Sequence, residues 1–198
     1  ASLAKVPHRF ALITGLGYAF QNAESGQRSI FQKMVHGLYA HALKHAHKVF
    51  FQNPDDLKLF QSMQLVSPQK PTVVVNGSGV NVQDFAVLDL PKNEHGQAKA
   101  SFLLIARLLG DKGVREYAEA ARIIKAKHPK VEFHLVGWID ENPAAIAQAE
   151  LDTWVAEKVV NYWGKLSDVR PAIAASSVYV LPSYREGTPR TVLEAMAM

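Results

Sequence analysis

Short apolar runs alternate with amphipathic stretches throughout the second half of the chain. The runs predict strands at residues 102–106, 131–136, 159–163 and 178–181, and a period of 3.6 predicts helices at 113–127, 143–158, 168–175 and from about 189 onward. The first and last of these strands contain no charged residue, which is typical of parallel strands covered on both faces. With right-handed crossovers, the pattern predicts an α/β fold with a doubly wound parallel sheet.

The first half of the chain is less regular. Apolar residues recur at three- and four-residue spacing between Arg28 and Phe50, which predicts an amphipathic helix. We expect a strand at 49–51, a helix at 55–65 that Asn53 caps with Pro54 at its first position, and a strand at 72–75. Residues 85–97 contain turn-forming residues and little periodicity, so we interpret them as a linker between two domains, 1–84 and 98–198.

Composition excludes several classes of protein. The chain has 198 residues, of which 48% are hydrophobic and 20% charged, as in ordinary globular proteins. No apolar run approaches the roughly 18 residues of a spanning helix, so we expect no transmembrane segment. The absence of cysteine excludes disulfides, thiolate metal sites and a thiol nucleophile.

The formal net charge of +4 favours anionic partners. We do not expect nucleic acid among them, because the sequence shows no clustered basic face with interleaved aromatic residues. The chain has no initiator methionine and ends inside a predicted helix, so we interpret it as a fragment of a longer protein that is inactive alone.

Charged residues follow two of the predicted strands. In the strand order 3-2-1-4, the first and fourth strands are neighbours, and ligands bind beyond their carboxyl ends. Here those ends carry residues 107–113 and 183–190. Arg107 and Lys112 can clamp a diphosphate, the arginine through its planar fork and the lysine as a point charge. The alternative for this loop is an ordinary solvated connection.

The second loop combines acceptors with a predicted helix start. Thr188 is a good N-cap and Pro189 a good first residue, so free N–H groups would face a phosphate there. Glu186 and Glu194 flank this turn and can accept hydrogen bonds from sugar hydroxyls. The alternative places Glu186 at the surface and makes Glu194 a partner of the helix dipole.

Several motifs in order along the chain resemble retaining glycosyltransferases of the GT-B fold, family four. The C-terminal half of that family is matched at Ala106, Arg107 and Leu108 with Lys112 and Gly113, at 135–137, at Gly164 with Asp168 and Val169, at 181–189 and at 193–197. Residues 15–20, 50–53 and 75–80 resemble the end of the N-terminal domain in the subset that builds bacterial surface polysaccharides. The resemblance therefore implies a partial GT-B fold, with the end of the acceptor-side domain and the first part of the nucleotide-sugar domain.

The resemblance also implies residue roles. Arg107 and Lys112 would bind the diphosphate of a sugar nucleotide and act in catalysis with Glu186, which would contact the donor sugar. Glu194 would bind the ribose. The remaining donor contacts would come from backbone atoms and loop edges, at Gly187, Thr188 and Pro189 beside the sugar and phosphate and at Lys165 and Leu166 beside the base.

The implied reaction transfers a hexosyl group with retention from a nucleotide-diphosphate donor, with UDP favoured, to a lipid-linked or saccharide acceptor. An undecaprenyl-diphosphate-linked saccharide is the acceptor that the resemblance favours. We expect no cofactor, and no metal ion because the sequence has no Asp-x-Asp signature. Two alternatives remain, a GT-B UDP-sugar epimerase and a non-catalytic nucleotide-binding fragment.

Four other patterns carry weaker signals. Gly15 and Gly17 form a partial dinucleotide fingerprint that lacks its third glycine, so we do not expect a nicotinamide site. His41 and His45 lack a third zinc ligand nearby. The basic amphipathic segment that carries them is either an ordinary domain helix or a peripheral contact with an anionic membrane, at its cytoplasmic face. For all three tryptophans we expect core packing.

Overall fold

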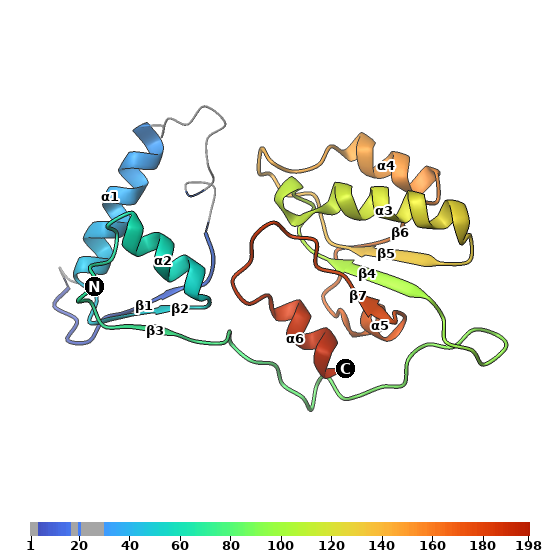
Figure 1. Cartoon of the computed structure of the whole chain (residues 1–198), viewed down its shortest axis with the longest axis horizontal. Coiled ribbons are helices and arrows are strands. Elements are labelled where there is room, and N and C mark those ends of the chain that lie inside the picture. Colours follow the sequence, from blue (N-terminus) through green and yellow to red (C-terminus); the bar gives the residue numbers. More distant parts are fainter. Residues whose placement is uncertain (1–3, 17–19, 21–29) are drawn as a thin grey trace. The chain divides into compact units, whose positions relative to one another are not determined.

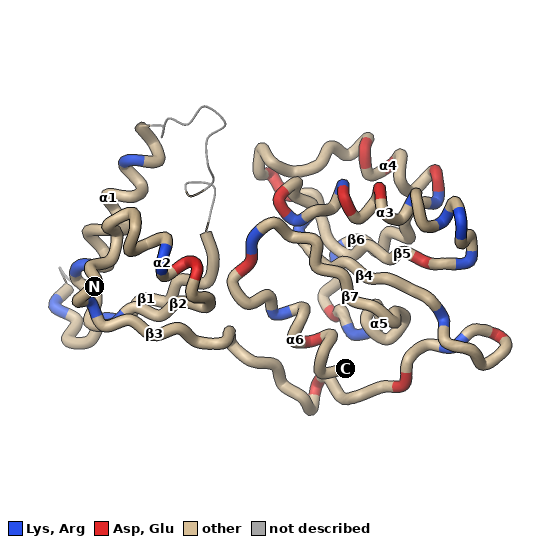
Figure 2. Tube along the Cα trace, viewed as in Figure 1, with Lys and Arg blue, Asp and Glu red and all other residues tan. Residues whose placement is uncertain are grey.

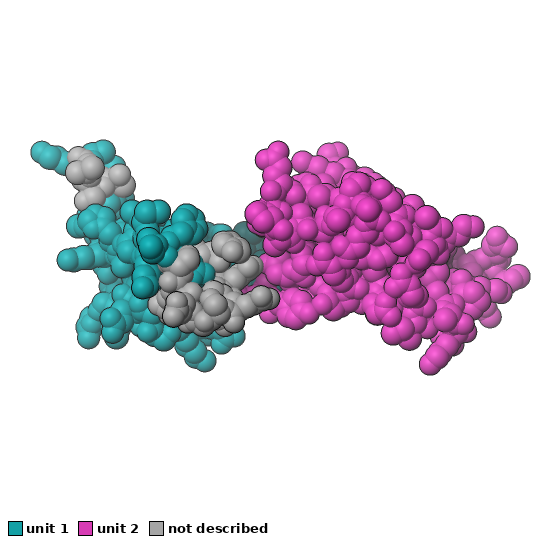
Figure 3. Space-filling view, turned by 90° about the horizontal axis from the view of Figure 1, so that it is seen from above, with its two compact units in different colours: residues 1–79, 186–189 teal, residues 80–185, 190–198 magenta. Residues whose placement is uncertain are grey.

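The computed structural model describes residues 4–16, 20 and 30–198, and these form two compact units (Figure 3). Unit 1 comprises residues 1–79 together with Glu186–Pro189, and unit 2 comprises Val80–Arg185 with Arg190–Met198. The predicted linker, residues 85–97, lies in unit 2, where Phe85 packs against the core and Lys92 forms an isolated bridge with Ala98.

Unit 1 is a parallel sheet with two helices on one face (Figure 1). Its strands lie in the order β1-β2-β3, with β1 at Phe10–Ile13, β2 at Lys48–Phe51 and β3 at Thr72–Val74, and its helices are α1 at Ile30–Lys44 and α2 at Pro54–Ser62. Phe51 and Phe60 are fully buried between sheet and helices. The Asn53 side chain accepts the Asp56 N–H at 2.7 Å and Pro54 begins α2, which confirms the predicted cap.

Unit 2 has the predicted doubly wound sheet. Its parallel strands lie in the order β6-β5-β4-β7, which is the order 3-2-1-4 along this half of the chain. The strands are β4 at Ser101–Ile105, β5 at Glu132–Val136, β6 at Asn161–Gly164 and β7 at Val178–Tyr179. The helices are α3 at Val114–Lys127, α4 at Gln148–Ala156, α5 at Arg170–Ala174 and α6 at Arg190–Ala197, and a 3-10 turn, η2, spans Gly110–Lys112.

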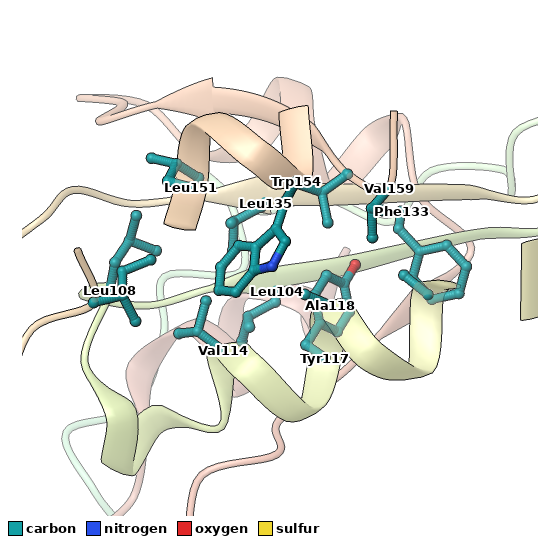
Figure 4. Packing of buried hydrophobic residues seen from close by; sticks show 13 residues of the cluster. Leu104, Leu108, Val114, Tyr117, Ala118, Phe133, Leu135, Leu151, Trp154 and Val159 are labelled. Atoms are coloured by element: carbon teal, nitrogen blue, oxygen red, sulfur yellow. The ribbon is translucent and has the colours of Figure 1, made fainter. Parts of the chain in front are cut away.

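Both faces of this sheet are covered, as the sequence predicts. On one face Leu104 and Leu135 pack against Val114, Tyr117 and Trp154 of α3 and α4 (Figure 4). On the other, a smaller cluster joins the sheet to α5 and α6 through Leu103, Val136, Ala172, Ile173 and Ala195. Adjacent residues of β4 thus serve opposite cores, which requires the uninterrupted apolar run seen in the sequence.

The outer surface of α3 and α4 is charged. Both blue and red positions occur along α3 (Figure 2), and two of its arginines reach carboxylates of the α4 segment. Arg115 donates two hydrogen bonds to the Glu150 carboxylate, at 2.6 and 3.0 Å, and Nη2 of Arg122 lies 2.7 Å from Oε2 of Glu157. These ion pairs link the two helices across their outer surface.

The helix predicted at 143–158 begins five residues late, so that prediction is wrong at its N-terminus. α4 starts at Gln148 because the preceding segment is drawn out along the loop that follows β4. Gly110 donates its N–H to the Ala144 carbonyl at 3.0 Å, and Ile146 donates to the Leu108 carbonyl at 3.0 Å. The first turn of a helix leaves N–H groups without partners inside the helix. Here the Ile146 N–H and the Ala144 carbonyl bond the loop after β4 instead, and the helix begins after them.

The tryptophans divide between core and surface. Trp154 is 6% exposed in the core of unit 2, as expected. The expectation is wrong for Trp138 and Trp163, which are 40% and 37% exposed at the carboxyl end of β5 and on β6. Sequence periodicity does not separate a residue at a strand end from one within the core.

His134 on β5 gives the fold a dependence on pH. Its Nδ1 accepts the Trp163 indole N–H at 3.1 Å, its Nε2 lies 3.2 Å from a Glu132 carboxylate oxygen, and burial lowers its pKa. Between this lowered pKa and the unfolded value of about 6.5, the unfolded chain binds more protons than the folded one. Stability contributed by neutral His134 is therefore complete above about pH 6.5 and is lost as the pH falls through that window.

We expect the melting temperature to decrease between pH 7.5 and pH 5.5, and to decrease less in His134→Gln. Differential scanning calorimetry at both pH values measures this. His128→Gln, at an exposed histidine just after α3, is the matched control and should retain the wild-type pH dependence. An identical slope in wild type and His134→Gln would contradict the assignment.

Candidate functional site

The loops after β4 and β7 lie together at the carboxyl edge of the unit 2 sheet. A Cβ atom on Gly113 would lie 2.3 Å from the Pro182 carbonyl oxygen. Tyr184 donates its N–H to the Asp111 carbonyl at 3.0 Å and its hydroxyl to a Glu116 carboxylate oxygen at 2.5 Å. The predicted neighbourhood of the first and fourth strands thus extends to the loops that follow them.

Arg107 leaves β4 and makes an ion pair. Its Nη1 lies 3.0 Å from Oδ2 of Asp140, which follows β5, and the guanidinium holds the pKa of that carboxyl below its usual range. The arginine side chain is 48% exposed. Sequence reasoning missed Asp140, although an acid a few residues beyond the end of the neighbouring strand was a signal that could have found it.

Lys165 follows β6 at the same edge of the sheet. Its Nζ lies 4.7 Å from the centroid of the Trp138 ring, within the range of a cation–π contact. Leu166 packs instead against the cluster beneath α5 and α6. The exposed indole and the lysine thus lie together at the end of β5 and β6.

Lys112 and Glu194 belong to the same unit. Lys112 closes η2 and is half-buried. Glu194 is only 6% exposed, on the second turn of α6, where its Oε1 lies 2.8 Å from Nε of the exposed Arg190. A carboxylate oxygen can accept from more than one donor, so Glu194 can also accept hydrogen bonds from hydroxyl groups.

The loop Glu186–Pro189 packs with residues of unit 1. Asn53 donates its side-chain N–H to the Glu186 carbonyl at 3.2 Å, and the Thr188 hydroxyl donates to the Gln52 carbonyl at 3.1 Å. A Cβ atom on Gly187 would lie 2.5 Å from the Thr14 carbonyl oxygen. Glycine is therefore required at this close approach of two backbones.

The predicted cap of the last helix is wrong in detail. α6 begins at Arg190, so Pro189 precedes the helix instead of occupying its first position. The hydroxyl of Thr188 is engaged as a donor to Gln52. The sequence signal of a threonine followed by proline located the start of α6 to within one or two residues, the usual uncertainty of a helix end.

The predicted residues fall into two groups. Arg107, Lys112, Lys165 and Glu194 belong to unit 2, as does Leu166, whereas Glu186, Gly187, Thr188 and Pro189 are counted with unit 1. Within unit 2, the ends of β4, β5 and β6 bring two cations, an exposed indole and Asp140 to one sheet edge.

Metal and membrane signals are weak in the described part of the chain. Within residues 4–16, 20 and 30–198, no three histidine or acidic side chains are grouped so that they could hold a metal ion. The rings of His41 and His45 lie 4.9 Å apart. None of the helices in these residues is both long and apolar enough to cross a bilayer. Gly17, the second glycine of the partial dinucleotide fingerprint, lies outside the described residues.

A known protein family matches the half of the chain that forms this sheet edge. The family model for glycosyl transferases group 1 matches residues 99–198, which include the sheet of unit 2 and the loops at its carboxyl edge. The chain belongs to this family. Group 1 glycosyltransferases thus account for the ordered motifs from Arg107 to Glu194 that the sequence displays.

Two relatives align over the whole chain. It is 33% identical to the N,N'-diacetylbacillosaminyl-diphospho-undecaprenol alpha-1,3-N-acetylgalactosaminyltransferase of Campylobacter jejuni, covering 100% of this chain and 52% of that protein. It is 28% identical to the UDP-Gal:alpha-D-GlcNAc-diphosphoundecaprenol alpha-1,3-galactosyltransferase of Escherichia coli, covering 100% and 51%. The chain therefore spans about half the length of these relatives.

The fold agrees with solved glycosyltransferase structures. The crystal structure of TarM superposes with a TM-score of 0.68 at 16% sequence identity, covering 98% of this chain and 35% of that one. At this identity the likeness shows the fold alone. The chain has part of a GT-B glycosyltransferase fold, as the resemblance in the sequence implied.

Proposed function

We propose that the protein containing this chain is a retaining hexosyltransferase. It would move a sugar from a nucleotide-diphosphate donor, with UDP-sugars favoured, to an undecaprenyl-diphosphate-linked saccharide. The reaction would belong to the synthesis of a bacterial surface polysaccharide. The observation that carries the proposal is similarity along the entire chain to two transferases whose names specify acceptors linked to undecaprenol through a diphosphate. The Escherichia coli relative also names UDP-Gal as its donor.

The unit 2 sheet edge would hold the donor. Arg107 and Lys112 would bind the diphosphate, Glu194 the ribose hydroxyls, and Lys165 with Leu166 the edge of the base. As the glycosidic bond breaks, negative charge builds on the leaving diphosphate, and the two cations would stabilise it. The diphosphate would take the proton of the acceptor hydroxyl, which attacks the same face of an oxocarbenium-like sugar.

The loop Glu186–Pro189 would also contact the donor, as the family resemblance implies. Glu186 would contact the sugar through its carboxylate, while Gly187, Thr188 and Pro189 would approach the sugar and phosphate with backbone atoms.

Helix α1 would meet the membrane in which a lipid-linked acceptor resides, at its cytoplasmic face. Four large apolar side chains, each more than half exposed, lie on one side of α1: Ile30, Phe31, Met34 and Leu38. Lys33 and Lys44 lie beside this stripe, and no acidic residue occurs in the helix. An exposed apolar stripe with basic neighbours fits an interfacial helix on anionic lipid. Co-sedimentation with vesicles that does not depend on their anionic lipid would remove this part of the proposal.

The experiment for the whole proposal uses the intact protein, UDP-sugars, and an acceptor carrying a diphosphate-linked saccharide. Mass spectrometry of the products should show one added hexosyl unit, and NMR should show the donor's anomeric configuration retained. Conversion of UDP-GlcNAc into an epimer without acceptor would indicate an epimerase instead. Inversion at the anomeric carbon would overturn the retaining assignment.

We also propose that transfer needs no metal ion, since two cationic side chains would neutralise the leaving diphosphate. Activity of the intact protein should be unchanged by EDTA, and adding Mg²⁺ or Mn²⁺ should not raise it. Loss of turnover in EDTA, restored by a divalent cation, would contradict this and would require another account of the charge on the diphosphate.

A further inference from the structure

The carboxylate of Asp140 is held firmly at the position where it meets Arg107. Its Oδ1 accepts the Asn142 N–H at 3.0 Å, and the Asn142 side chain in turn accepts the Ala144 N–H at 2.9 Å. With Oδ1 engaged in this turn, Oδ2 points to the Arg107 guanidinium at 3.0 Å. The pair is therefore set by the backbone as well as by attraction between two side chains.

The two segments that carry Arg107 and Asp140 are also tied to each other. Leu108 donates its N–H to the Trp138 carbonyl at 2.9 Å, and Leu108 and Gly110 exchange further backbone bonds with Ile146 and Ala144. A Cβ atom on Gly137 would lie 1.9 Å from the Ala106 carbonyl oxygen, so the segments touch at their starts too. Such support on both sides keeps the acid beside the arginine whether or not a ligand is present.

We infer that Asp140 is a built-in counter-ion for Arg107, which competes with the diphosphate of the donor and of the released nucleotide for the guanidinium. The inference rests on the proposed function, because it takes the diphosphate as the ligand of Arg107. Within the described residues, Asp140 is the side chain that bonds this guanidinium. When the donor binds, either the diphosphate replaces Asp140 as the partner of Arg107, or Asp140 stays and its negative charge lies close to the diphosphate.

Either outcome weakens the hold on the diphosphate and favours release of the nucleotide product. An arginine fork that is already bonded at Nη1 offers fewer donors to a phosphate than a free one. A carboxylate next to that fork also repels the phosphate charges, at a range shorter than the screening length of physiological salt. Asp140 would thus set the affinity for the leaving group without touching the sugar.

Two substitutions remove this charge and retain the turn. Asp140→Asn and Asp140→Ser can both still accept the Asn142 N–H, and Glu157→Gln is the matched control, since it removes one negative charge from another arginine pair at the end of α4. The titrants are UDP, inorganic pyrophosphate and uridine, measured by calorimetry on the intact protein at two salt concentrations.

We expect the dissociation constants of UDP and pyrophosphate to fall about 3- to 10-fold in both Asp140 variants at low salt, with a smaller gain at high salt. Binding of uridine should not change, and Glu157→Gln should behave as wild type. A gain of affinity is not a result that structural damage produces. Unchanged or weaker UDP binding in both variants would overturn the counter-ion role while leaving the proposed function in place. If wild type binds neither UDP nor pyrophosphate, the inference and the proposed function both fall.

Discussion

Replacing Arg107 with alanine should reduce turnover of the intact protein about 100- to 1,000-fold, the loss typical of removing one preorganised donor to a developing anion. The guanidinium is half-exposed at the end of β4 and lies outside the hydrophobic clusters, so its removal should not unfold the sheet. Because charge on the diphosphate is greatest as the glycosidic bond breaks, kcat should fall more than the affinity for donor. Steady-state kinetics with a UDP-sugar donor, together with calorimetry of UDP, measures both effects.

Arg122→Ala is the matched control for this substitution. Arg122 is an arginine of similar exposure, 44%, on α3, and its two acidic partners lie on the outer surface of the helices. The substitution Arg122→Ala should leave kcat and UDP affinity unchanged. Arg107→Lys should recover part of the loss, since a point charge replaces the fork. Wild-type kinetics in Arg107→Ala would show that the diphosphate binds elsewhere.

The architecture around Arg107 was predictable from sequence because it depends on periodicity. Apolar runs such as the one that contains Leu103 and Leu104 must serve two cores at once, and only a parallel sheet with helices on both faces satisfies them. The strand order β6-β5-β4-β7 is the common order of doubly wound sheets, 3-2-1-4, on which the prediction relied. The meeting of the loops after β4 and β7 followed from that order.

The details that escaped prediction depend on contacts between segments distant in sequence. The late start of α4 results from backbone pairing of Ala144 and Ile146 with the β4 loop, which competes with helix formation. The pairing of Asp140 with Arg107 depends on the same docked segment. Local propensity carries no information about either contact, and the position of Asp140 just beyond β5 was a signal for the second contact alone.

The loop Glu186–Pro189 also makes contacts that the sequence did not predict. Their identity pointed to backbone recognition, and the resemblance to a family supplied roles for them. The sequence did not predict that the Thr188 hydroxyl and the Glu186 carbonyl would bond Gln52 and Asn53. Buried backbone N–H and carbonyl groups must find hydrogen-bond partners anywhere in the fold, whereas capping rules consider only the helix that follows the cap.

Gly113→Ala should destabilise the protein and weaken donor binding together. Gly113 adopts φ +68°, in the left-handed region, and a Cβ atom there would lie 2.3 Å from the Pro182 carbonyl oxygen and 2.8 Å from its carbon. Alanine must therefore adopt a strained backbone and also displace the loop after β7. Strain and overpacking together should cost about 2 to 5 kcal/mol of unfolding free energy.

Gly96→Ala separates the two contributions. Gly96 has a similar φ of +74°, but a Cβ atom there would meet nothing within 4 Å. Its substitution should cost about 1 kcal/mol, the strain of a left-handed residue alone. Urea denaturation gives both free energies, and calorimetry of UDP should show weaker binding in Gly113→Ala only. Equal stability losses in the two variants would mean that the loops after β4 and β7 do not touch at Pro182, and the proposed diphosphate site would lose its closest structural support.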